Sequence, residues 1–599
     1  MTKARDTANI IKQPFTQTLG TSNYRAGVNA GNSIASGGNN NTVVGDEAGT
    51  AITTGDNNTA LGKSSFETNT TGGNNTALGF QTLQVNTTAS ENTAIGHNTL
   101  SANTTGAGNL GAGYQVLSKN TTADYNTGLG YDALNKNTTG TQNVSVGAFS
   151  LDANTTGNYN TAVGKSSLGA NTTGASNVAI GESALDANTI GTNNTAVGNG
   201  ALGAEVAGQF SVAIGNNALM TQSNGSSTDV YNTAVGLNAG KLITTGTENT
   251  LVGALAGDAI TTGVRNTAVG KSSLSANTTG DFNTAVGRTA LENVTTADGN
   301  TAVGVAAGSQ TTTGANNTAM GYLALNLNTT GARNNAFGGN ALDANTTASE
   351  NNAFGFGALG SNTTGSENVA IGQDCLTLNT TASGNTASGT GSLKTNTTGA
   401  TNTAFGKFSL RQNTTGTSNT AVGYQAGLIA TTGDNNTAIG DSALQSLTTG
   451  DGNVAIGQAS GGQGNMINIT TESNRGVFGH DSITHSYVKV DWTVTSDQRD
   501  KMNFSEVPHG LSFVNDLQPV KFNFKKSREN ATPHGKTKYG FKAQDILALE
   551  GNNPIVIDNE NEDSLKITNS HLIPILVKAL QELSTKLDTA VARIAELEG

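Results

Sequence analysis

The chain has 599 residues and 78 glycines, and only 12% of its residues are charged and 5% aromatic. Such a composition supplies many turns and little side-chain volume, so it excludes a large conventional hydrophobic core. The formal net charge is −12. The central array has no basic stripe, which argues against nucleic acid as a partner and favours neutral or glycan-like partners.

The start of the chain, MTKARDTANIIKQPF, contains no apolar run long enough for a signal peptide or a membrane helix. We therefore expect cytoplasmic synthesis and no membrane insertion. The lone Cys375 cannot form an intrachain disulfide, and this cysteine usage is compatible with that compartment.

A pentad with the consensus N-T-A-V-G recurs every 17 residues from Asn41 to Gly457, in 25 copies with a single four-residue slip after the pentad at 211. The full unit is NTAVGxxALxxNTTGxx, and it contains none of the six prolines. A period near 20 residues is typical of stacked solenoids, and a ladder that uses its backbone amides excludes proline. The sequence therefore predicts a mainly β protein with a long solenoid or β-roll shaft over 31–457.

Within the pentad the second residue is mostly Thr or Val, the third Ala, and the fourth Val, Leu or Ile. Positions two and four share one face of a short strand, and we predict that this face points inward. Examples of the fourth residue are Val44, Leu61, Leu78, Ile95, Val163, Ile180 and Val197. The A-L pair adds a second apolar point, and N-T-T-G closes the unit with residues that tolerate left-handed conformations. The expected order in one repeat, called a rung below, is strand, turn, short strand, turn.

One rung buries too few aliphatic side chains to offset the entropy lost when its residues become ordered. Stacking of rungs and lateral association of identical chains are expected to supply the remaining stabilisation. Pentads such as NVAIG at 177 and SVAIG at 211 resemble the β-roll repeats in the heads of trimeric autotransporter adhesins. The resemblance implies a trimeric β-roll and leaves its handedness open.

Other interpretations of the array have ordinary structural alternatives. N-T-T matches the N-glycosylation sequon in most rungs, but without a secretory signal the turn interpretation is favoured. Rows of Thr also occur in ice-binding solenoids, although Thr pairs are common in turns. The array lacks the G-G-x-G-x-D motif of calcium-binding repeats, and we predict no metal and no cofactor. The insertion near 219–231 is predicted to be a bulge or a flexible joint.

The composition changes after Gly457, where the pentad stops. Five of the six histidines lie in the last fifth of the chain, at a spacing that fits no zinc signature: His480, His485, His509, His534 and His571. The stretch SYVKVDWTV alternates as a strand. Its Trp492, the only tryptophan, is more readily a core plug than a sugar-stacking residue. We predict a distal tip over 458–495.

The last 104 residues, 496–599, read as a small α+β domain. Leu511, Val514 and Leu517 have helical spacing, and Val520, Phe522 and Phe524 alternate as a strand. KYGFKAQDILALE then reads as a strand followed by a helix. The final helix keeps coiled-coil spacing at Ile573, Leu576, Leu580, Leu583, Leu587, Ala590, Ile594 and Leu597. This apolar seam predicts oligomerisation.

Four motifs occur in order within this domain: SDQRDK, LQPVKF, YGFKAQD and LIPILVKALQEL. Together they resemble the C-terminal intramolecular chaperone of phage endosialidases, tail fibres and tailspikes. That resemblance implies a domain that trimerises, folds the β-structured fibre ahead of it and then cuts itself off before the Ser of its S-D-x-R-x-K motif. It implies Ser496 as the nucleophile, Lys501 as its base, and a cleavage site between Thr495 and Ser496.

The chemistry sets two requirements for this pair. Lysine is a base only when burial leaves it neutral, and a spacing of five residues does not place both side chains on one helical face. A loop, or a neighbouring chain, must therefore bring them together. Taken alone, Ser496 followed by Asp497 would be an ordinary helix N-cap, and the other three motifs reverse that judgement.

The sequence therefore predicts a homotrimeric phage tail fibre, a structural protein of the virion that mediates host adsorption. Residues 1–30 are predicted to bind a tail or baseplate protein. The tip is predicted to bind a host receptor, expected to be a glycan, through His480, His485, Tyr487 and Trp492. Any enzymatic activity is limited to a single-turnover self-cleavage. The alternatives are a non-phage adhesin, an ice-binding solenoid, and a glycan-degrading tailspike, for which the rungs offer no evident paired carboxylates.

Overall fold

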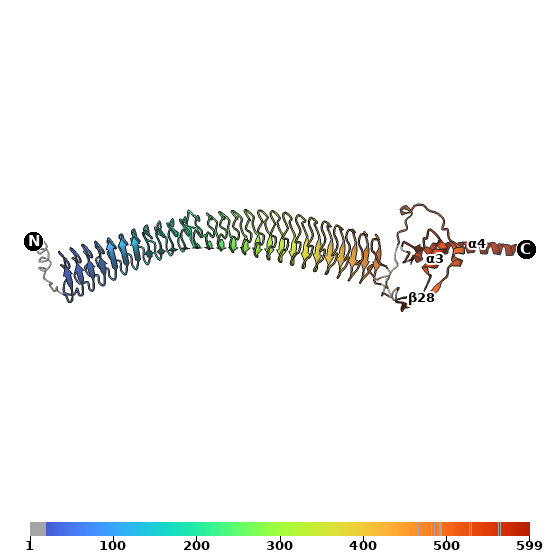
Figure 1. Cartoon of the computed structure of the whole chain (residues 1–599), viewed down its shortest axis with the longest axis horizontal. Helices are drawn as coiled ribbons and strands as arrows, with labels where there is room; N and C mark the ends of the chain where they lie inside the picture. The colour runs from blue at the N-terminus through green and yellow to red at the C-terminus, as the bar shows by residue number, and fades with distance from the viewer. Residues whose placement is uncertain are drawn as a thin grey trace. The chain divides into compact units, whose positions relative to one another are not determined.

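The computed structural model describes residues 20–463, 467–480, 482–483, 486–487, 489, 494–525, 528, 530–560, 562–563 and 565–599. The chain divides into two parts, residues 1–384 and 385–599. Figure 1 shows the repeated rungs and the C-terminal elements in chain order.

In the first part each strand pairs in parallel with the next strand along the chain, in register and one rung apart. The strands are β1 (Tyr24–Ala26), β2 (Thr42–Val44), β3 (Thr59–Leu61), β4 (Thr76–Leu78), β5 (Thr93–His97), β6 (Leu110–Tyr114), β7 (Thr127–Tyr131), β8 (Val144–Val146), β9 (Thr161–Val163), β10 (Val178–Ile180), β11 (Thr195–Val197), β12 (Val212–Ile214), β13 (Thr233–Val235), β14 (Thr250–Val252), β15 (Thr267–Val269), β16 (Thr284–Val286), β17 (Thr301–Val303), β18 (Thr318–Met320), β19 (Asn335–Phe337), β20 (Asn352–Phe354) and β21 (Val369–Ile371). The predicted β-solenoid with 17-residue spacing is confirmed.

The second part continues the same pattern. Its solenoid strands are β22 (Thr386–Ser388), β23 (Thr403–Phe405), β24 (Thr420–Val422), β25 (Thr437–Ile439), β26 (Val454–Ile456) and β27 (Gly476–Phe478). β27 pairs in parallel with β26, inside the segment predicted to form the tip. At the other end, β1 pairs with β2 inside the segment predicted for attachment. The stack therefore extends one rung beyond the regular pentads at each end.

Buried asparagines join successive rungs. Oδ1 of Asn143 accepts hydrogen bonds from the backbone N–H of Asn160 at 2.9 Å and from its Nδ2 at 3.1 Å. Oδ1 of Asn160 accepts the same pair from Asn177 at 3.0 and 3.2 Å. These first residues of the pentad are fully buried, so each amide satisfies polar groups that water cannot reach.

The Asn of N-T-T-G forms a second ladder beside the first. Nδ2 of Asn171 donates to Oδ1 of Asn154 at 2.9 Å and to the carbonyl of Gly174 at 3.1 Å. The same carbonyl accepts Nδ2 of Asn160 at 2.9 Å. The two ladders therefore meet in each rung of this kind, and together they hold the turn against the strand.

The predicted direction of the strand face is wrong. The third residue of the pentad points inward, as the fully buried Ala60, Ala77 and Ala162 show, whereas the fourth residue is exposed, at 43% for Leu61 and 38% for Leu78. The same position is also fully buried where it carries a larger side chain, at Val43 and Leu251. Where Gly111 replaces the alanine, a Cβ built there lies 2.6 Å from Cγ2 of Thr99.

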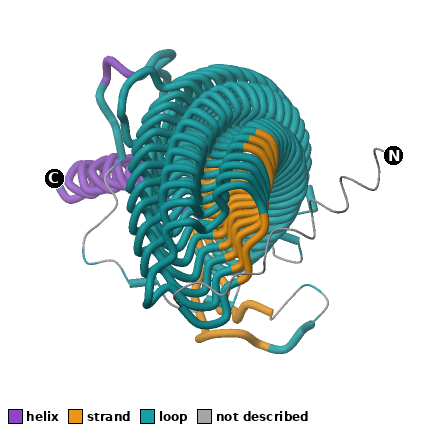
Figure 2. Tube along the Cα trace, turned by 90° about the vertical axis from the view of Figure 1, so that its left-hand side faces the viewer, coloured by secondary structure: helices purple, strands orange, loops and turns teal. Residues whose placement is uncertain are grey.

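The predicted second short strand is also absent from the described rungs. The leucine of the A-L pair is fully buried as expected, but its backbone is left-handed, with φ of 48° at Leu83 and 52° at Leu100. A non-glycine residue in that region carries a conformational cost, which burial of the side chain offsets. Figure 2 shows the result: the strands lie along one side of the rungs, and turns form the remainder.

The four-residue insertion is anchored around a buried carboxylate. Glu205 stands where the second ladder would have asparagine, and it is fully buried. Its Oε1 accepts the backbone N–H of Gly208 at 2.7 Å and of Asn224 at 3.2 Å. Its Oε2 accepts Nε2 of Gln222 at 2.8 Å and Nδ2 of Asn224 at 3.2 Å. The base of the inserted loop is thus hydrogen-bonded to the solenoid interior.

The C-terminal elements confirm the predicted small α/β region. They are the 3₁₀ turn η1 (Gln498–Asp500), α2 (Leu511–Asp516), β28 (Val520–Lys525), β29 (Pro533–Gly540), α3 (Ala543–Glu550), β30 (Ile557–Asp558), β31 (Lys566–Ile567), the 3₁₀ turn η2 (Asn569–His571) and α4 (Leu572–Glu598). β28 and β29 form an antiparallel hairpin, and β30 pairs with β31. A compact core joins α2, α3, β30 and α4 through Phe513, Ile546, Val556, Ile557, Leu572 and Ile575.

Helix α4 has two apolar faces. Leu572, Ile575 and Ala579 are buried, and α4 contacts α2, the backbone N–H of Leu511 donating to Glu582 at 2.8 Å. The predicted coiled-coil residues lie on the other face, and Leu580 is 67% exposed and Leu587 62%. The core face and the coiled-coil seam of this helix are therefore separate surfaces.

The ladder predicts a specific effect of Asn160→Ala. The substitution leaves the buried N–H of Asn177 without its acceptor, which costs about 1–3 kcal/mol. Hydrogen exchange measured by mass spectrometry is expected to speed up in the rungs on either side of residue 160. Thr173→Ala, at an exposed position of the next turn, is the control, and equal exchange in both variants would contradict the role assigned to the ladder.

Candidate functional site

The segment that follows the solenoid folds into one tight turn at the predicted site. Asp497 is the N-cap of η1, and its side chain accepts the backbone N–H of Arg499 at 2.8 Å. The backbone N–H of Lys501 closes the turn on the carbonyl of Gln498 at 3.2 Å. Because the turn reverses the chain within five residues, the side chains at its two ends can meet.

Ser496 and Lys501 do meet at the ends of this turn. Nζ of Lys501 lies 2.5 Å from Oγ of Ser496, within hydrogen-bond distance. The turn therefore brings together two side chains that a helix would place on different faces, as the five-residue spacing requires. The arrangement is that of a nucleophile with a base in direct contact, and the roles of the two residues stay predictions.

Charged neighbours fix the turn without engaging the lysine. Nη2 of Arg499 lies 2.6 Å from Oδ2 of Asp497. These hydrogen bonds from Arg499 hold the pKa of the Asp497 carboxyl below its ordinary value and raise the pKa of Arg499. The cap is therefore intact above the ordinary pKa of an aspartate and is lost only as the pH falls through the lowered value. Within the described residues, Asp500 forms no ion pair with Lys501.

Both members of the pair are exposed in the single chain. A serine hydroxyl is a weak nucleophile without a base, and burial is what allows a lysine to act as one. The geometry for proton transfer is thus present in one chain, whereas the burial that would discharge the lysine is not.

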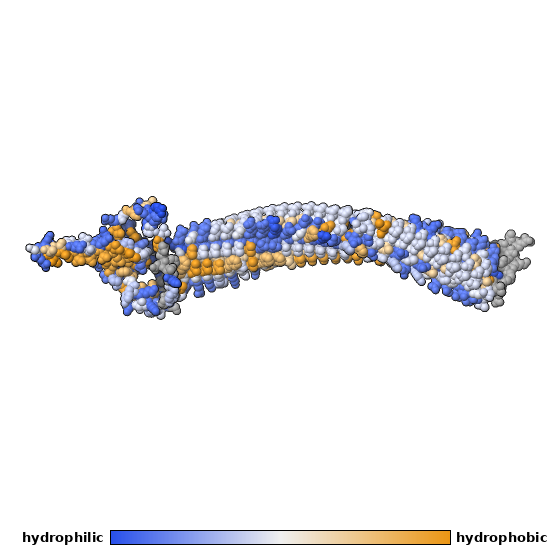
Figure 3. All heavy atoms as spheres, turned by 180° about the vertical axis from the view of Figure 1, so that it is seen from behind, coloured by the Kyte–Doolittle hydropathy of each residue, from blue (hydrophilic) through white to orange (hydrophobic). Residues whose placement is uncertain are grey.

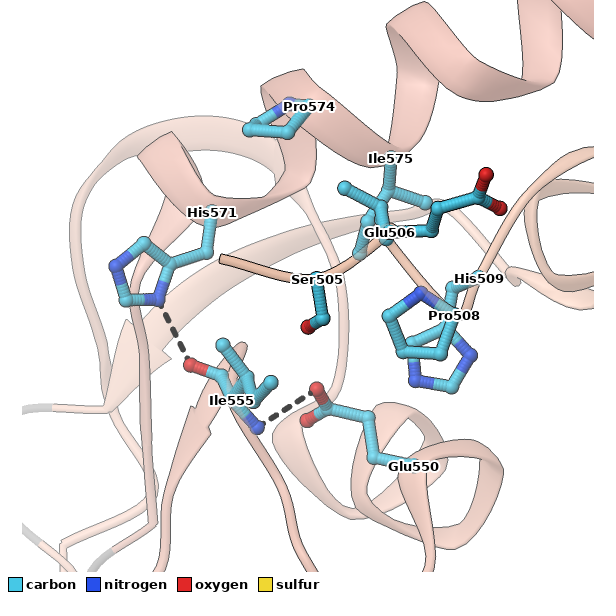
Figure 4. Close-up of a pocket in the computed structure, with 10 residues that line it drawn as sticks. Ser505, Glu506, Pro508, His509, Glu550, Ile555, His571, Pro574 and Ile575 are labelled. Carbon is cyan, nitrogen blue, oxygen red and sulfur yellow. Dashed lines mark hydrogen bonds between the residues drawn. The ribbon is translucent and has the colours of Figure 1, made fainter. Parts of the chain in front are cut away.

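The α/β region also contains a cavity of about 250 Å³, lined in part by Ser505, Glu550 and His571 (Figure 4). The side chains of Glu550 and His571 are hydrogen-bonded to backbone groups. The Glu550 carboxylate accepts the N–H groups of Ile555, Val556 and Ile557 at 2.7 to 3.0 Å, and Nδ1 of His571 donates to the carbonyl of Ile555 at 2.8 Å. These bonds give both groups a structural role, and no described hydrogen bond joins Ser505 to His571.

The four predicted receptor residues are only partly described. Nδ1 of His480 lies 2.8 Å from Oγ of Ser482, and Tyr487 is 90% exposed. His485 and Trp492 lie outside the described residues, as does most of the strand predicted around them. His480 is half-buried, and the assignment of all four residues stays a prediction.

No group of three or more potential metal-ligating side chains occurs in the described part of the chain. Among the described helices, none combines the length and the apolar character that crossing a membrane requires.

A parallel β-solenoid followed in the chain by a small α/β region with a serine–lysine contact defines a repeat protein with a distinct C-terminal module. In a comparison with protein families, residues 496–551 match the chaperone of endosialidase. The chain thus carries a chaperone-of-endosialidase domain, and the match begins at Ser496 and runs through α3. No curated protein and no solved structure matches the chain.

The cap predicts that Asp497→Ala slows any cleavage at Ser496 severalfold without abolishing it. The substitution removes the side-chain acceptor that caps η1, so Lys501 spends less time beside Ser496. The rate is measured by following the cleaved fragment on denaturing gels. Gln498→Ala, in the same turn but with an exposed side chain, is the control, and an unchanged rate in Asp497→Ala would show that the cap does not position the pair.

Proposed function

We propose that this protein is a homotrimeric phage tail fibre whose C-terminal domain assembles the fibre and then removes itself by cleavage before Ser496. The observation that carries the proposal is the contact between Ser496 and Lys501 at the first residue of the chaperone-of-endosialidase match. The solenoid supports the structural half of the proposal, because its uniform rungs suit a shaft.

The proposed cleavage has balanced chemistry. Oγ of Ser496 attacks the carbonyl carbon of Thr495, and its proton passes to neutral Nζ of Lys501. Lys501 returns the proton to the departing nitrogen of Ser496, so that the amide becomes an ester. Water then hydrolyses the ester, leaving a carboxylate on Thr495 and a free amino group and hydroxyl on Ser496. Each chain reacts once.

Assembly would supply the activation that the single chain lacks. Lys501 is exposed, and a neighbouring chain packed over η1 would remove water from its amine. Desolvation disfavours the charged form of lysine, so cleavage would follow trimerisation. The exposed seam of α4 supports this order, because Leu580, Leu587 and Ile594 form an apolar stripe that suits parallel copies of the helix.

Substitution of the pair tests the cleavage. Ser496→Ala and Lys501→Ala are each expected to leave a full-length chain that is still trimeric by light scattering, because one lacks the nucleophile and the other the base. Mass spectrometry of the unaltered protein is expected to find a C-terminus at Thr495.

Ser505→Ala is the matched control, since Ser505 lies nine residues further on in the same domain and lines the cavity. It is expected to be cleaved normally. A Thr495 terminus in both Ser496→Ala and Lys501→Ala would contradict the assignment.

Host recognition is assigned to the tip, residues 458–495, and virion attachment to residues 1–30. The shaft uses its Asn and Gly residues in its own turns, whereas the tip breaks the period and exposes Tyr487 at 90%. Specific recognition of a receptor, in this proposal a host glycan, needs such irregular surface. Cleavage would place this segment at the free end of the mature chain.

Adsorption to host cells tests this assignment. Tyr487→Ala together with His480→Ala is expected to reduce adsorption at least tenfold, since a few central contacts dominate most binding sites. Deletion of one rung, residues 266–282, is the control and is expected to adsorb normally. If the rung deletion abolishes adsorption while the folded tip variant binds, recognition lies on the shaft.

A further inference from the structure

The outward strand face carries a continuous row of apolar side chains in the first part of the chain. Each of the twenty pentads between residues 41 and 384 contributes its fourth residue. The row consists of Val44, Leu61, Leu78, Ile95, Ala112, Leu129, Val146, Val163, Ile180, Val197, Ile214, Val235, Val252, Val269, Val286, Val303, Met320, Phe337, Phe354 and Ile371. The parallel register places each member beside the next. Figure 3 shows an apolar band along part of the shaft on the face in view.

The row is exposed and uncharged. Larger members such as Ile95, Ile180 and Ile214 are 39 to 40% exposed. The second residue of the pentad, on the same face, is Thr, Val, Asn or Leu throughout this part of the chain. The face formed by these two rows, called the outer strand face below, therefore has no charged side chain.

Charged side chains of the same rungs lie in other rows. Arg265 pairs with Glu248 at 3.0 Å and Arg333 with Glu350 at 2.6 Å, all in the position before the pentad asparagine. These cross-rung pairs show that charge is accepted on the shaft surface. Its exclusion from the outer strand face needs a separate reason, and exposed apolar patches of this extent mark interaction sites.

We propose that the outer strand face is the surface through which copies of this chain associate side by side along the shaft. The face repeats once per rung. A partner can therefore contact every rung in the same way only if its own surface repeats with the same spacing. A second copy of the chain, parallel and in register, meets this condition.

The available area suffices for such an interface. At about 50 Å² of exposed apolar surface per rung, the twenty rungs present on the order of 1,000 Å², against roughly 800 Å² per partner in a standard interface. The contribution of a single rung is small, so the association depends on many rungs acting together.

The number of associating copies, three, rests on the proposed function. The proposed cleavage also explains why the shaft would need an interface of its own. Removal of residues 496–599 would also remove the α4 seam. The remaining shaft must then hold its copies together through its own surface, and the outer strand face is the uncharged apolar surface that runs through every rung of the first part.

Thiol cross-linking tests the inference in a full-length Ser496→Ala background. Ile95→Cys and Ile180→Cys each place a thiol on the outer strand face. Both are expected to give covalent dimers on denaturing gels with a short bifunctional thiol reagent. Self-linkage at two levels requires a parallel, in-register pair, because an antiparallel pair brings only one level to its own copy.

Two further variants serve as controls. Thr173→Cys places a thiol at an exposed turn away from the strand and is expected to stay monomeric on the gel. Leu597→Cys, 80% exposed on α4, reports the C-terminal seam. The native thiol does not interfere, because Cys375 is buried and its burial raises the pKa of the thiol to about 12.

The outcomes separate the inference from the proposed function. Cross-links at Ile95, Ile180 and Leu597 support both. Cross-links at Leu597 alone overturn the inference, leave the trimer standing and free the face for another occupant. Cross-links at the two strand positions alone support the inference and contradict the helical seam. Cross-links nowhere overturn both, and linkage at Thr173 as strong as at Ile180 overturns the inference.

Discussion

The buried asparagine amide is the interaction on which the shaft depends. A rung of 17 residues has too little apolar volume to close around a hydrophobic core. Its interior is instead closed by side-chain amides such as those of Asn160 and Asn171, which share the carbonyl of Gly174 and continue into the neighbouring rungs. Each amide is useful only when the next rung is in place, because an unpaired buried amide is costly. Stability of the shaft is therefore a property of the stack.

The sequence predicted the period, the strand and the buried leucine, because each is a local pattern. It predicted the wrong strand face as inward. Alternation shows that the second and fourth residues share a face, but alanine between two apolar residues fits either side. The packing of successive rungs decides, and it buries the third residue, as at Ala60 and Ala77. The left-handed leucines were missed for a related reason: isolated leucine disfavours that conformation, and burial against neighbouring rungs overrides the preference.

At the candidate site, the sequence identified Ser496 and Lys501 and the need for a loop between them. The cap at Asp497 was foreseeable, since an aspartate two residues before the bonded N–H is a common turn device. The carboxylates of Glu582 and Glu550, which hold other parts of the domain, could not be foreseen. Glu582 reaches the start of α2 from 71 residues away, and Glu550 folds back on three backbone N–H groups beyond its own helix. Such contacts depend on tertiary packing, which local patterns do not encode.

The uniform rungs that stabilise one chain make it difficult to align several chains with one another. Rungs that are nearly identical carry little information about axial alignment, so copies displaced by one repeat would bury almost as much surface as copies in register. The information has to come from parts of the chain that do not repeat, and the C-terminal domain supplies most of them: a packed core around Phe513 and Ile546 and a helix with its own apolar seam. In the proposed scheme that domain is needed only until the stack has closed, since the ladders and the outer strand face then hold the alignment cooperatively. Cleavage at the boundary between repeating and non-repeating sequence would therefore remove the part that sets the register after the register has become a property of the shaft.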